Sequence, residues 1–550
     1  MPALTLHLTA DTTVDNLAGF LKRASGAAIE CSVAPYNQAA QTLMGAPQAS
    51  QLLLWTTPDQ QLRSFRRLLN FEAVPPEDIY AEVDGFAAMV RAAAAKYANV
   101  FFMSWTFPPD RRWPLGLASK PGFGAADILA RANLRLVDAL ADAPNVHIID
   151  LGLLQAGFPK ALHDARLNII GRMRFTPDFL KYVAEQIHPV IEASIKPSKK
   201  IVICDLDNTL WGGVVGDDGV EGLRLGGNDP VGEAHLKLQQ ELKALNNRGI
   251  LLAISSKNSP EIAFEAFRTH PNMLLKEADF SARRINWDDK AANILSLLEE
   301  LNLLPSAAVF LDDNPTERSR IRDAIPDLLV PELPKDVALW PGLVGGLGGF
   351  ETLTLSREDV DRAANYRSES ERRESMTLHA DLGEWLRSLD IVLTARALRG
   401  MDLARTVQLL NKTNQFNLHT RRMSESEFAD WCAGEDRRCY TFSVADRFGD
   451  SGLTGLVTVE KEDGGWRVVD YVMSCRVMGK GVEDAIIAET ISRTGAVGAL
   501  RIGATPTAKN GPAREFVSRI APQGVVPASF VRPEHIKVVS EPDGGAGGPG

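Results

Sequence analysis

Cysteine is scarce in this chain, and its pattern excludes two kinds of structure. The 550 residues contain an odd number of cysteines, which are widely scattered and show no C-x-x-C spacing. Disulfide frameworks and structural zinc sites both need closely and regularly spaced cysteines. We therefore expect reduced thiols at all five positions, Cys31, Cys204, Cys432, Cys439 and Cys475.

Long hydrophobic runs and an excess of positive charge are missing as well. No stretch reaches the roughly 20 apolar residues that a membrane-spanning helix needs, and the first residues, MPALTLHLTADTT, do not have the pattern of a secretory signal. The net charge of −10 gives no sequence-wide basic surface. We expect a cytoplasmic protein without a nucleic-acid or membrane partner.

The remaining composition is that of a globular protein with several domains. Hydrophobic residues make up 45% of the chain and charged residues 24%, and this length is enough for roughly three or four cores. A proline-punctuated stretch, a charged helical connector and a glycine-rich tail mark the boundaries. The predicted divisions are 1–198, 199–345, 346–381 (connector), 382–538 and 539–550 (disordered tail).

Strand and helix patterns alternate in the first division. Short apolar runs such as QLLLW and VFFMSW are separated by helical stretches, which predicts a doubly wound α/β domain. The Pro- and Gly-rich stretch over 107–124 is expected to be a surface loop. Because it follows a strand end, where such folds bind ligands, a binding role for it stays open.

The clearest chemistry follows an apolar strand in the second division. The run IVIC ends at residue 204 and is followed by Asp205 and Asp207, whose side chains point to the same side of an extended chain. One carboxylate can attack phosphorus while the other protonates the leaving oxygen and later deprotonates water. A divalent cation would screen their mutual repulsion.

Three further motifs follow in order along the same division. A second apolar strand ends in the hydroxyl groups of Ser255 and Ser256, Lys290 begins a helix, and the strand VFL ends in two carboxylates, Asp312 and Asp313. These four parts in this order resemble the haloacid dehalogenase (HAD) superfamily of phosphatases, which implies a Rossmann-like fold and a Mg²⁺ cofactor.

That resemblance also implies a role for each residue. Asp205 becomes the nucleophile, Asp207 the acid/base and Lys290 the residue that neutralises the phosphoaspartate. The implied metal ligands are Asp205, Asp312 and, through its backbone carbonyl, Asp207, with Asp313 as either a further ligand or an outer-shell group. The implied phosphate-binding residues are Thr209, Ser256, Lys257 and Asn258.

The second division has no room for a large cap domain over this site. Only the glycine-rich segment 212–227 and one helix fit between Asp207 and Ser255, and the segment before Lys290 is short too. The site should be open, which suits a phosphate displayed on a macromolecule better than a small metabolite.

The third division shows the element order of an N-acetyltransferase-type (GNAT-like) fold, beginning with a strand DIVLTARAL and a helix over 401–417. Between its last central strand and the next helix stands Arg476-Val-Met-Gly479-Lys480-Gly481, which resembles the pyrophosphate loop of that fold and implies pantetheine or carrier binding. Cys475 precedes the loop. Arg476 and the helix terminus would lower the pKa of its thiol, so Cys475 is the nucleophile candidate, although free cysteines are more often buried hydrophobic residues.

The motifs CDLDNTLWGGVVGDDG, FLDDNPTER, QLLNKTNQFNLHTRR and SCRVMGKGVE together resemble the FkbH-like family. The resemblance implies a glyceryl transferase and phosphatase that takes the acyl group of 1,3-bisphosphoglycerate, removes the phosphate and loads an acyl carrier protein in polyketide biosynthesis. The family's first domain is SGNH-hydrolase-like. Here LTADTT replaces the Gly-Asp-Ser motif, so we predict no hydrolase activity there, while Tyr36-Asn37-Gln38 and Asn133 could keep a binding role. His419, in the stretch NLHT, occupies a position at which the neighbouring residues of the motif would suit a Thr.

Two other functions remain open from the sequence. The chain could be a Mg²⁺-dependent phosphatase for a phosphorylated sugar, metabolite or protein, with a third division that binds acyl-CoA or a partner. It could also be a non-catalytic carrier-docking module, which the full set of acids and Lys290 argues against. The acyl unit, the carrier and the oligomeric state are not specified by the sequence.

Overall fold

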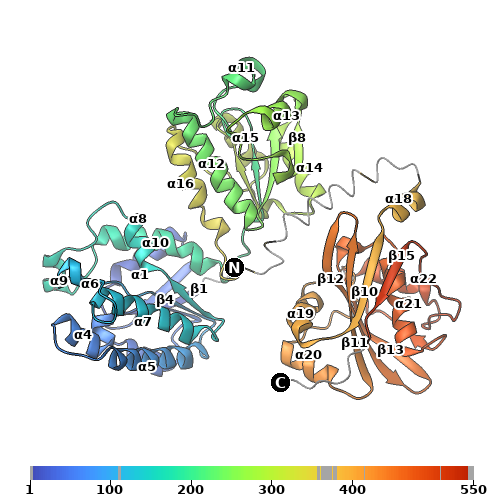
Figure 1. The fold of residues 1–550 in the computed structure, drawn as a ribbon, viewed down its shortest axis with the longest axis horizontal. Coiled ribbons are helices and arrows are strands. Elements are labelled where there is room, and N and C mark those ends of the chain that lie inside the picture. The colour runs from blue at the N-terminus through green and yellow to red at the C-terminus, as the bar shows by residue number, and fades with distance from the viewer. Residues whose placement is uncertain are drawn as a thin grey trace. The chain divides into compact units, whose positions relative to one another are not determined.

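The computed structural model describes residues 4–109, 113–355, 360, 375, 381–413, 415–507 and 509–542. Three separate β-sheets organise this part of the chain, in the order of their strands along the sequence (Figure 1). Each sheet carries its own helices. The predicted connector and tail lie mostly outside the described residues.

The first sheet is parallel and has the strand order β2-β1-β3-β4-β5. Alternate residues of β3 face opposite sides: Leu52 and Leu54 pack with α5 and α7, whereas Leu53 and Trp55 pack with α1 and α10. Helices on both faces confirm the doubly wound prediction; the likeness to SGNH hydrolases stays a prediction. The elements are β1 Leu4–Ala10, α1 Asp15–Ala24, β2 Ile29–Val33, α2 Ala39–Met44, β3 Gln51–Trp55, α3 Pro58–Gln61, α4 Arg63–Leu69, α5 Pro76–Ala94, β4 Asn99–Met103, α6 Leu115–Ala118, α7 Ala125–Leu140, β5 Val146–Ile149, α8 Leu151–Gly157, α9 Ala165–Gly171 and α10 Pro177–Glu192.

The second sheet has the order β8-β7-β6-β9, so the strand that precedes Asp205 lies between two neighbours. All four residues of β6 are buried and apolar, as expected for a central strand. The elements are β6 Ile201–Cys204, α11 Val215–Gly222, α12 Pro230–Asn247, β7 Leu251–Ser256, α13 Pro260–Thr269, β8 Phe280–Ile285, α14 Lys290–Glu300, β9 Ala308–Leu311, α15 Pro315–Ala324 and α16 Trp340–Gly345.

The connections in this second region are short. Between β6 and β7 the chain forms α11 and α12, and between β7 and β8 it forms α13 and one 3₁₀ turn. Neither connection holds a separate cap domain among the described residues, as the sequence predicts.

The third sheet has the order β14-β13-β12-β11-β10-β15, antiparallel in its centre and parallel in its outermost pairs. Helices α21 and α22 pack on one hydrophobic cluster, and α19 and α20 on another. This confirms the predicted GNAT-like element order and adds β15 at the edge. The elements are α18 Leu382–Ser388, β10 Ile391–Ala397, α19 Leu403–Lys412, α20 Glu425–Cys432, β11 Arg437–Asp446, β12 Gly449–Glu462, β13 Gly465–Met473, α21 Val482–Thr494, β14 Leu500–Arg501, α22 Gly511–Ile520 and β15 Ile536–Ser540.

One predicted helix is shorter than expected. The helix predicted over 401–417 is α19, which ends at Lys412. The helix does not continue beyond Lys412. The side-chain amide of Asn417 instead donates to the carbonyls of Leu410 (3.3 Å) and Thr413 (3.1 Å). A side chain that satisfies the last helical carbonyls ends the helix instead of extending it.

Within the described residues, every helix is too short or too polar to cross a bilayer.

Candidate active site

Asp205 and Asp207 follow β6, and the structure gives them different surroundings. Asp205 is 8% exposed, whereas Asp207 is half-buried. After Asp205 the chain turns, because the N–H groups of Thr209 and Leu210 both donate to the carbonyl of Leu206. The turn ends the strand and leaves both carboxylates at its carboxyl end, the position predicted from the sequence.

Lys290 is the partner of Asp205. Its Nζ lies 2.9 Å from Oδ2 of Asp205, and both side chains are buried, 5% and 11% exposed. Lys290 is the first residue of α14, which the side chain of Asp289 caps by accepting from the N–H of Ala292. An unpaired charge would be costly at this depth, so the contact between the two side chains compensates each of them.

The second oxygen of Asp205 is left for another group. Its Oδ1 is buried and has no hydrogen-bond partner in the described structure. One oxygen each from Asp205, Asp312 and Asp313 lie within 4.8 Å of one another. Three hard carboxylate oxygens around a shared point are the donor set that Mg²⁺ prefers, so the residues present fit the predicted cofactor.

Arg318 holds the backbone of the two acids that follow β9, Asp312 and Asp313. Its buried guanidinium donates through Nη1 to the carbonyls of Asp312 and Asp313, at 2.8 Å each. The Oδ1 atom of Asp312 also accepts from the N–H of Asn314 at 2.8 Å. These bonds orient Asp312, which is fully buried, before any ligand arrives.

Asp207 is surrounded by donors. Its Oδ1 accepts from the indole N–H of Trp211 (2.9 Å) and the backbone N–H of Val215 (3.1 Å), and its Oδ2 accepts from the side-chain amide of Asn258 (2.9 Å). Burial raises the pKa of Asp207 above its usual range; the bonds from Val215 and Trp211 oppose the shift, and the charge of Asp205 adds to it. A raised pKa suits a residue that must carry a proton to the leaving group.

The residues predicted to bind phosphate gather around the ends of β6 and β7. Ser256 is the last residue of β7 and is buried, as is Thr209; Lys257 is half-buried. Asn258 gives one amide N–H to Asp207, so it also orients the carboxylate that is predicted to be the acid/base. Phosphate binding by these four residues stays a prediction.

Three residues of the site, Trp211, Val215 and Arg318, were not indicated by the sequence. Trp211 stands four residues after Asp207, and Arg318 is a basic residue four positions after Asn314, but neither spacing indicates where the side chain points. The indole of Trp211 is a donor with no acceptor group, which could have suggested an anionic neighbour.

The loop after β13 has the backbone conformation expected of an anion-binding loop. Gly479 and Gly481 have φ values of 75° and 80°, in the left-handed region that favours glycine, and Gly481 precedes α21. Lys480 is buried, and its Nζ donates to the carbonyl of Arg476 at 3.0 Å. Cys475 begins the 3₁₀ turn that opens the loop. Its side chain lies outside the described part, and its role as a nucleophile stays a prediction.

A carboxylate of the chain itself already contacts this loop. Oε1 of Glu483 accepts from the N–H of Gly479 at 3.2 Å, and its buried Oε2 has no partner among the described residues. Burial raises the pKa of Glu483, and the charge of Asp484 raises it further. An anionic ligand at Gly479 therefore has to compete with Glu483.

The segment from Phe416 to Arg422 runs along β13, in a place that the sequence did not indicate. The N–H of Met473 donates to the carbonyl of Phe416 (3.0 Å), and that of Leu418 to the carbonyl of Tyr471 (3.2 Å). β14 pairs with β13 at Trp466 and Arg467, the start of that strand. The segment thus covers the part of the β13 edge that β14 leaves open.

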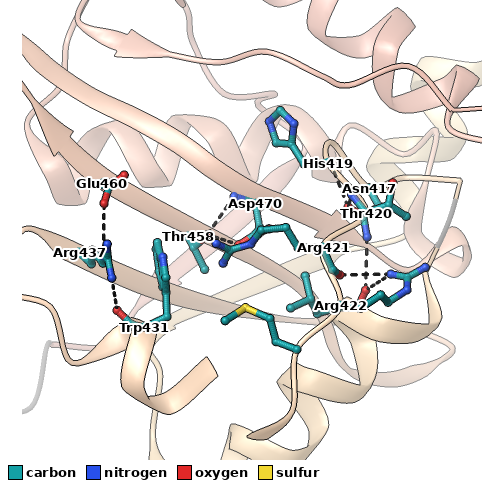
Figure 2. A network of polar contacts seen from close by, with 12 residues as sticks. Asn417, His419, Thr420, Arg421, Arg422, Trp431, Arg437, Thr458, Glu460 and Asp470 are labelled. Atoms are coloured by element: carbon teal, nitrogen blue, oxygen red, sulfur yellow. Dashed lines mark hydrogen bonds and ion pairs between the residues drawn. The ribbon is translucent and has the colours of Figure 1, made fainter. Parts of the chain in front are cut away.

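Figure 2 shows the polar network that holds this segment in place. Arg421 binds the fully buried Asp470 through two nitrogen atoms, at 3.0 and 2.8 Å, and Thr458 donates to the same carboxylate at 2.7 Å. The ring of Trp431 lies 4.9 Å from the guanidinium of Arg421 and 5.0 Å from that of Arg437. Asp470 is thereby compensated and the segment is tied to the sheet.

His419 points away from this network in Figure 2, and its Nδ1 lies 2.8 Å from the hydroxyl of Thr505. Burial lowers the pKa of His419. The residue that looked out of place in the sequence thus has a defined hydrogen-bond partner, contributed by the segment that follows β14.

The sheet order of the second region and its lysine-paired aspartate match the HAD-like fold predicted from the sequence. A solved structure agrees. The N-terminal part of protein BF1531 from Bacteroides fragilis, which contains a phosphatase domain and is complexed with Mg, is 29% identical to this chain; the match covers 64% of this chain and 95% of that one, with a TM-score of 0.57. The magnesium in that neighbour supports the predicted cofactor.

A second solved structure that matches part of this chain is the ribosomal-protein-S18-alanine N-acetyltransferase from Escherichia coli. It is 14% identical, and the match covers 24% of this chain and 76% of that one; its TM-score of 0.19 is too low to support an argument. No family model and no curated protein matches the chain. Membership of the FkbH-like family therefore stays a prediction.

Proposed function

We propose that this chain is a bifunctional glyceryl transferase and phosphatase. It takes the acyl group of 1,3-bisphosphoglycerate, removes the remaining phosphate and loads glyceryl, or a similar three-carbon acyl unit, onto an acyl carrier protein. The observation that carries the phosphatase half is Asp205, a buried carboxylate with one oxygen on Lys290 and the other unpartnered beside two more acids.

The phosphatase half follows from the two aspartates. A carboxylate oxygen of Asp205 attacks phosphorus, and Asp207 gives its proton to the leaving oxygen. Asp207 then takes a proton from water, which attacks phosphorus and releases phosphate from Asp205. Asp205, Asp312, Asp313 and the carbonyl of Asp207 would hold Mg²⁺, which neutralises the charge of the phosphoryl group. Lys290 balances Asp205 throughout.

The open approach to this site favours a tethered substrate. The connections that could form a lid are short, with α11 and α12 after β6 and α13 after β7. A phosphate on a flexible arm can reach such a site without domain closure. This supports a phosphoglyceryl group carried on a thiol.

The transferase half rests on the third domain. The thiolate of Cys475 attacks the carbonyl carbon of the acyl phosphate, a thioester forms and inorganic phosphate leaves. After the second phosphate is removed, the pantetheine thiol of the carrier attacks the thioester and frees Cys475. Arg476, Gly479, Lys480 and Gly481 would receive the phosphate of the pantetheine arm.

Intact-mass analysis of the carrier tests this function. A phosphopantetheinylated carrier protein is incubated with the enzyme, Mg²⁺ and 1,3-bisphosphoglycerate, and we expect a glyceryl adduct. The Cys475→Ala variant should load nothing. The proposal is contradicted if every one of several candidate carriers stays unmodified, or if loading persists in Cys475→Ala.

A second candidate is a Mg²⁺-dependent phosphatase for a phosphorylated sugar, metabolite or protein, whose third domain only docks a partner. Glu483 favours this second candidate, because its carboxylate already accepts a hydrogen bond from the N–H of Gly479. The phosphate of a carrier's pantetheine arm would need that same N–H as a donor. Fast turnover of simple phosphomonoesters, without any covalent adduct on Cys475, would support this candidate over the first.

A further inference from the structure

Two thiols that neither proposed reaction uses lie side by side in the third domain. Cys432 is the last residue of α20, and Cys439 lies on β11. Both line one cavity of about 560 Å³, and both belong to the same hydrophobic cluster. Cys432 is half-buried, whereas Cys439 is 7% exposed, so a small reagent in the cavity meets Cys432 first.

The surroundings make the two thiols unequal. The hydrogen bond from Cys439 lowers the pKa of Cys432, and the guanidinium groups of Arg421 and Arg437 act in the same direction, against burial and the charge of Asp470. The same bond and burial raise the pKa of Cys439. A thiol of lowered pKa at Cys432 beside one of raised pKa at Cys439 is the arrangement of an attacking and a resolving cysteine.

The other described cysteines do not share these conditions. Burial raises the pKa of Cys31 to about 11 and raises that of the fully buried Cys204 as well. Neither lines the cavity. They serve as internal controls, since their thiols should stay reduced under mild oxidation.

We propose that Cys432 and Cys439 are a modification site, a dithiol that a peroxide closes to an intramolecular disulfide. The Cys432 thiolate attacks one peroxide oxygen and becomes a sulfenic acid, and the second oxygen leaves as water after protonation. The Cys439 sulfur then attacks the sulfenic sulfur, the S–S bond forms and a second water leaves. Two thiols and one hydrogen peroxide thus give one disulfide and two waters.

Closure of this disulfide acts on the network in Figure 2. Trp431 precedes Cys432 and stacks between the guanidinium groups of Arg421 and Arg437. Arg421 in turn holds Asp470 and the segment over 416–422. The disulfide would attach the end of α20 to β11 and hold Trp431 against the two guanidinium groups. Oxidation would thereby affect the segment at the edge of β13.

Peptide mapping of the full-length protein tests the site. Arg437 and Arg438 stand between the two cysteines, so trypsin separates them unless a disulfide holds the peptides together. The protein is reduced, freed of reductant, treated with a slight excess of hydrogen peroxide, then denatured and alkylated. We expect a linked peptide pair and loss of alkylation at Cys432 and Cys439, both reversed by dithiothreitol, with Cys31 and Cys204 still alkylated.

Two variants make the test specific. In Cys439→Ser, Cys432 should stop at the sulfenic acid and react with dimedone; in Cys475→Ala, the disulfide should form as in the parent protein. The proposal is wrong if Cys432 and Cys439 remain alkylated at a peroxide dose that oxidises Cys31. It is equally wrong if Cys432 pairs with Cys475 instead.

Discussion

The loop after β6 and the loop after β13 both follow a strand and both are predicted to bind a ligand, but they differ in whether the group that would meet the ligand already has a partner. At the first, the buried Oδ1 of Asp205 has no hydrogen-bond partner among the residues that the structure describes. At the second, the N–H of Gly479 is bonded to the carboxylate of Glu483.

The two loops therefore differ in how ready they are for a ligand. A buried acceptor without a partner costs free energy until a cation or a reacting group satisfies it, so the phosphoryl site is stabilised by binding. In the second loop the N–H of Gly479 is already bonded to Glu483, so a ligand there gains only the difference between its own bond to that N–H and the bond of Glu483.

Removal of Mg²⁺ should have the largest effect on this comparison, because only the first site depends on it. With EDTA we expect the hydrolysis of a simple phosphomonoester to fall at least about 10³-fold, as expected for a lost charge-stabilising ion, and to return with added Mg²⁺. Asp312→Asn should raise the Mg²⁺ concentration required, while Asp323→Asn, an exposed residue of α15, should not. Steady-state rates across a Mg²⁺ titration check this, and EDTA-resistant turnover would contradict it.

Lys290→Met should have the next largest effect. Loss of the ammonium leaves the buried carboxylate of Asp205 without its 2.9 Å partner, which costs about 3 kcal/mol of unfolding free energy. Denaturant unfolding of the metal-free protein measures this cost. Lys181→Met removes an exposed lysine of α10 and serves as the control. A Lys290→Met protein as stable as its parent would show that the pair is not the buried charge balance described above.

Glu483→Gln tests whether the second site is occupied by its own side chain. Without the negative charge, coenzyme A should bind about tenfold more tightly, which corresponds to roughly 1.4 kcal/mol. Asp484→Asn is the matched control, since this neighbouring carboxylate pairs with Arg519 instead of the loop. Calorimetric titration gives both affinities; equal affinity of Glu483→Gln and the parent would remove the contrast between the two loops.

Trp211→Phe should have the smallest effect, a shift in pH dependence. Asp207 must be protonated to serve as the acid, so activity falls as pH rises through its raised pKa. The indole N–H lowers that pKa; its removal should move the alkaline limb of kcat to higher pH. Trp340→Phe, another buried indole that donates to a carbonyl, should leave the limb in place. A downward shift in Trp211→Phe would contradict the assignment of Asp207.

The sequence predicted the elements that depend on local pattern. The apolar run before Asp205 and the carboxylates after β9 follow from strand alternation and chain order, and their proximity follows from the strand order of the sheet. The elements of the third domain were predicted in the same way, except for the length of α19 and the edge strand β15.

The contacts between distant side chains could not be predicted in this way. The bonds from Trp211 to Asp207, from Arg318 to the carbonyls of Asp312 and Asp313, and from Gly479 to Glu483 depend on how side chains point once the chain has turned. Asn417 ended α19 against its helical pattern, because its amide satisfies the last carbonyls and Phe416 pairs with β13. Tertiary pairing outweighed local propensity there.

The most direct test of the account is the product left by Asp205→Asn. The variant is incubated with Mg²⁺, 1,3-bisphosphoglycerate and a phosphopantetheinylated carrier, and the carrier and the Cys475 peptide are weighed by mass spectrometry. If Asp205 removes the phosphate after Cys475 has captured the acyl group, the variant accumulates a phosphoglyceryl thioester where the parent protein gives glyceryl. A glyceryl product from Asp205→Asn, equal in amount to that of the parent, would contradict the account.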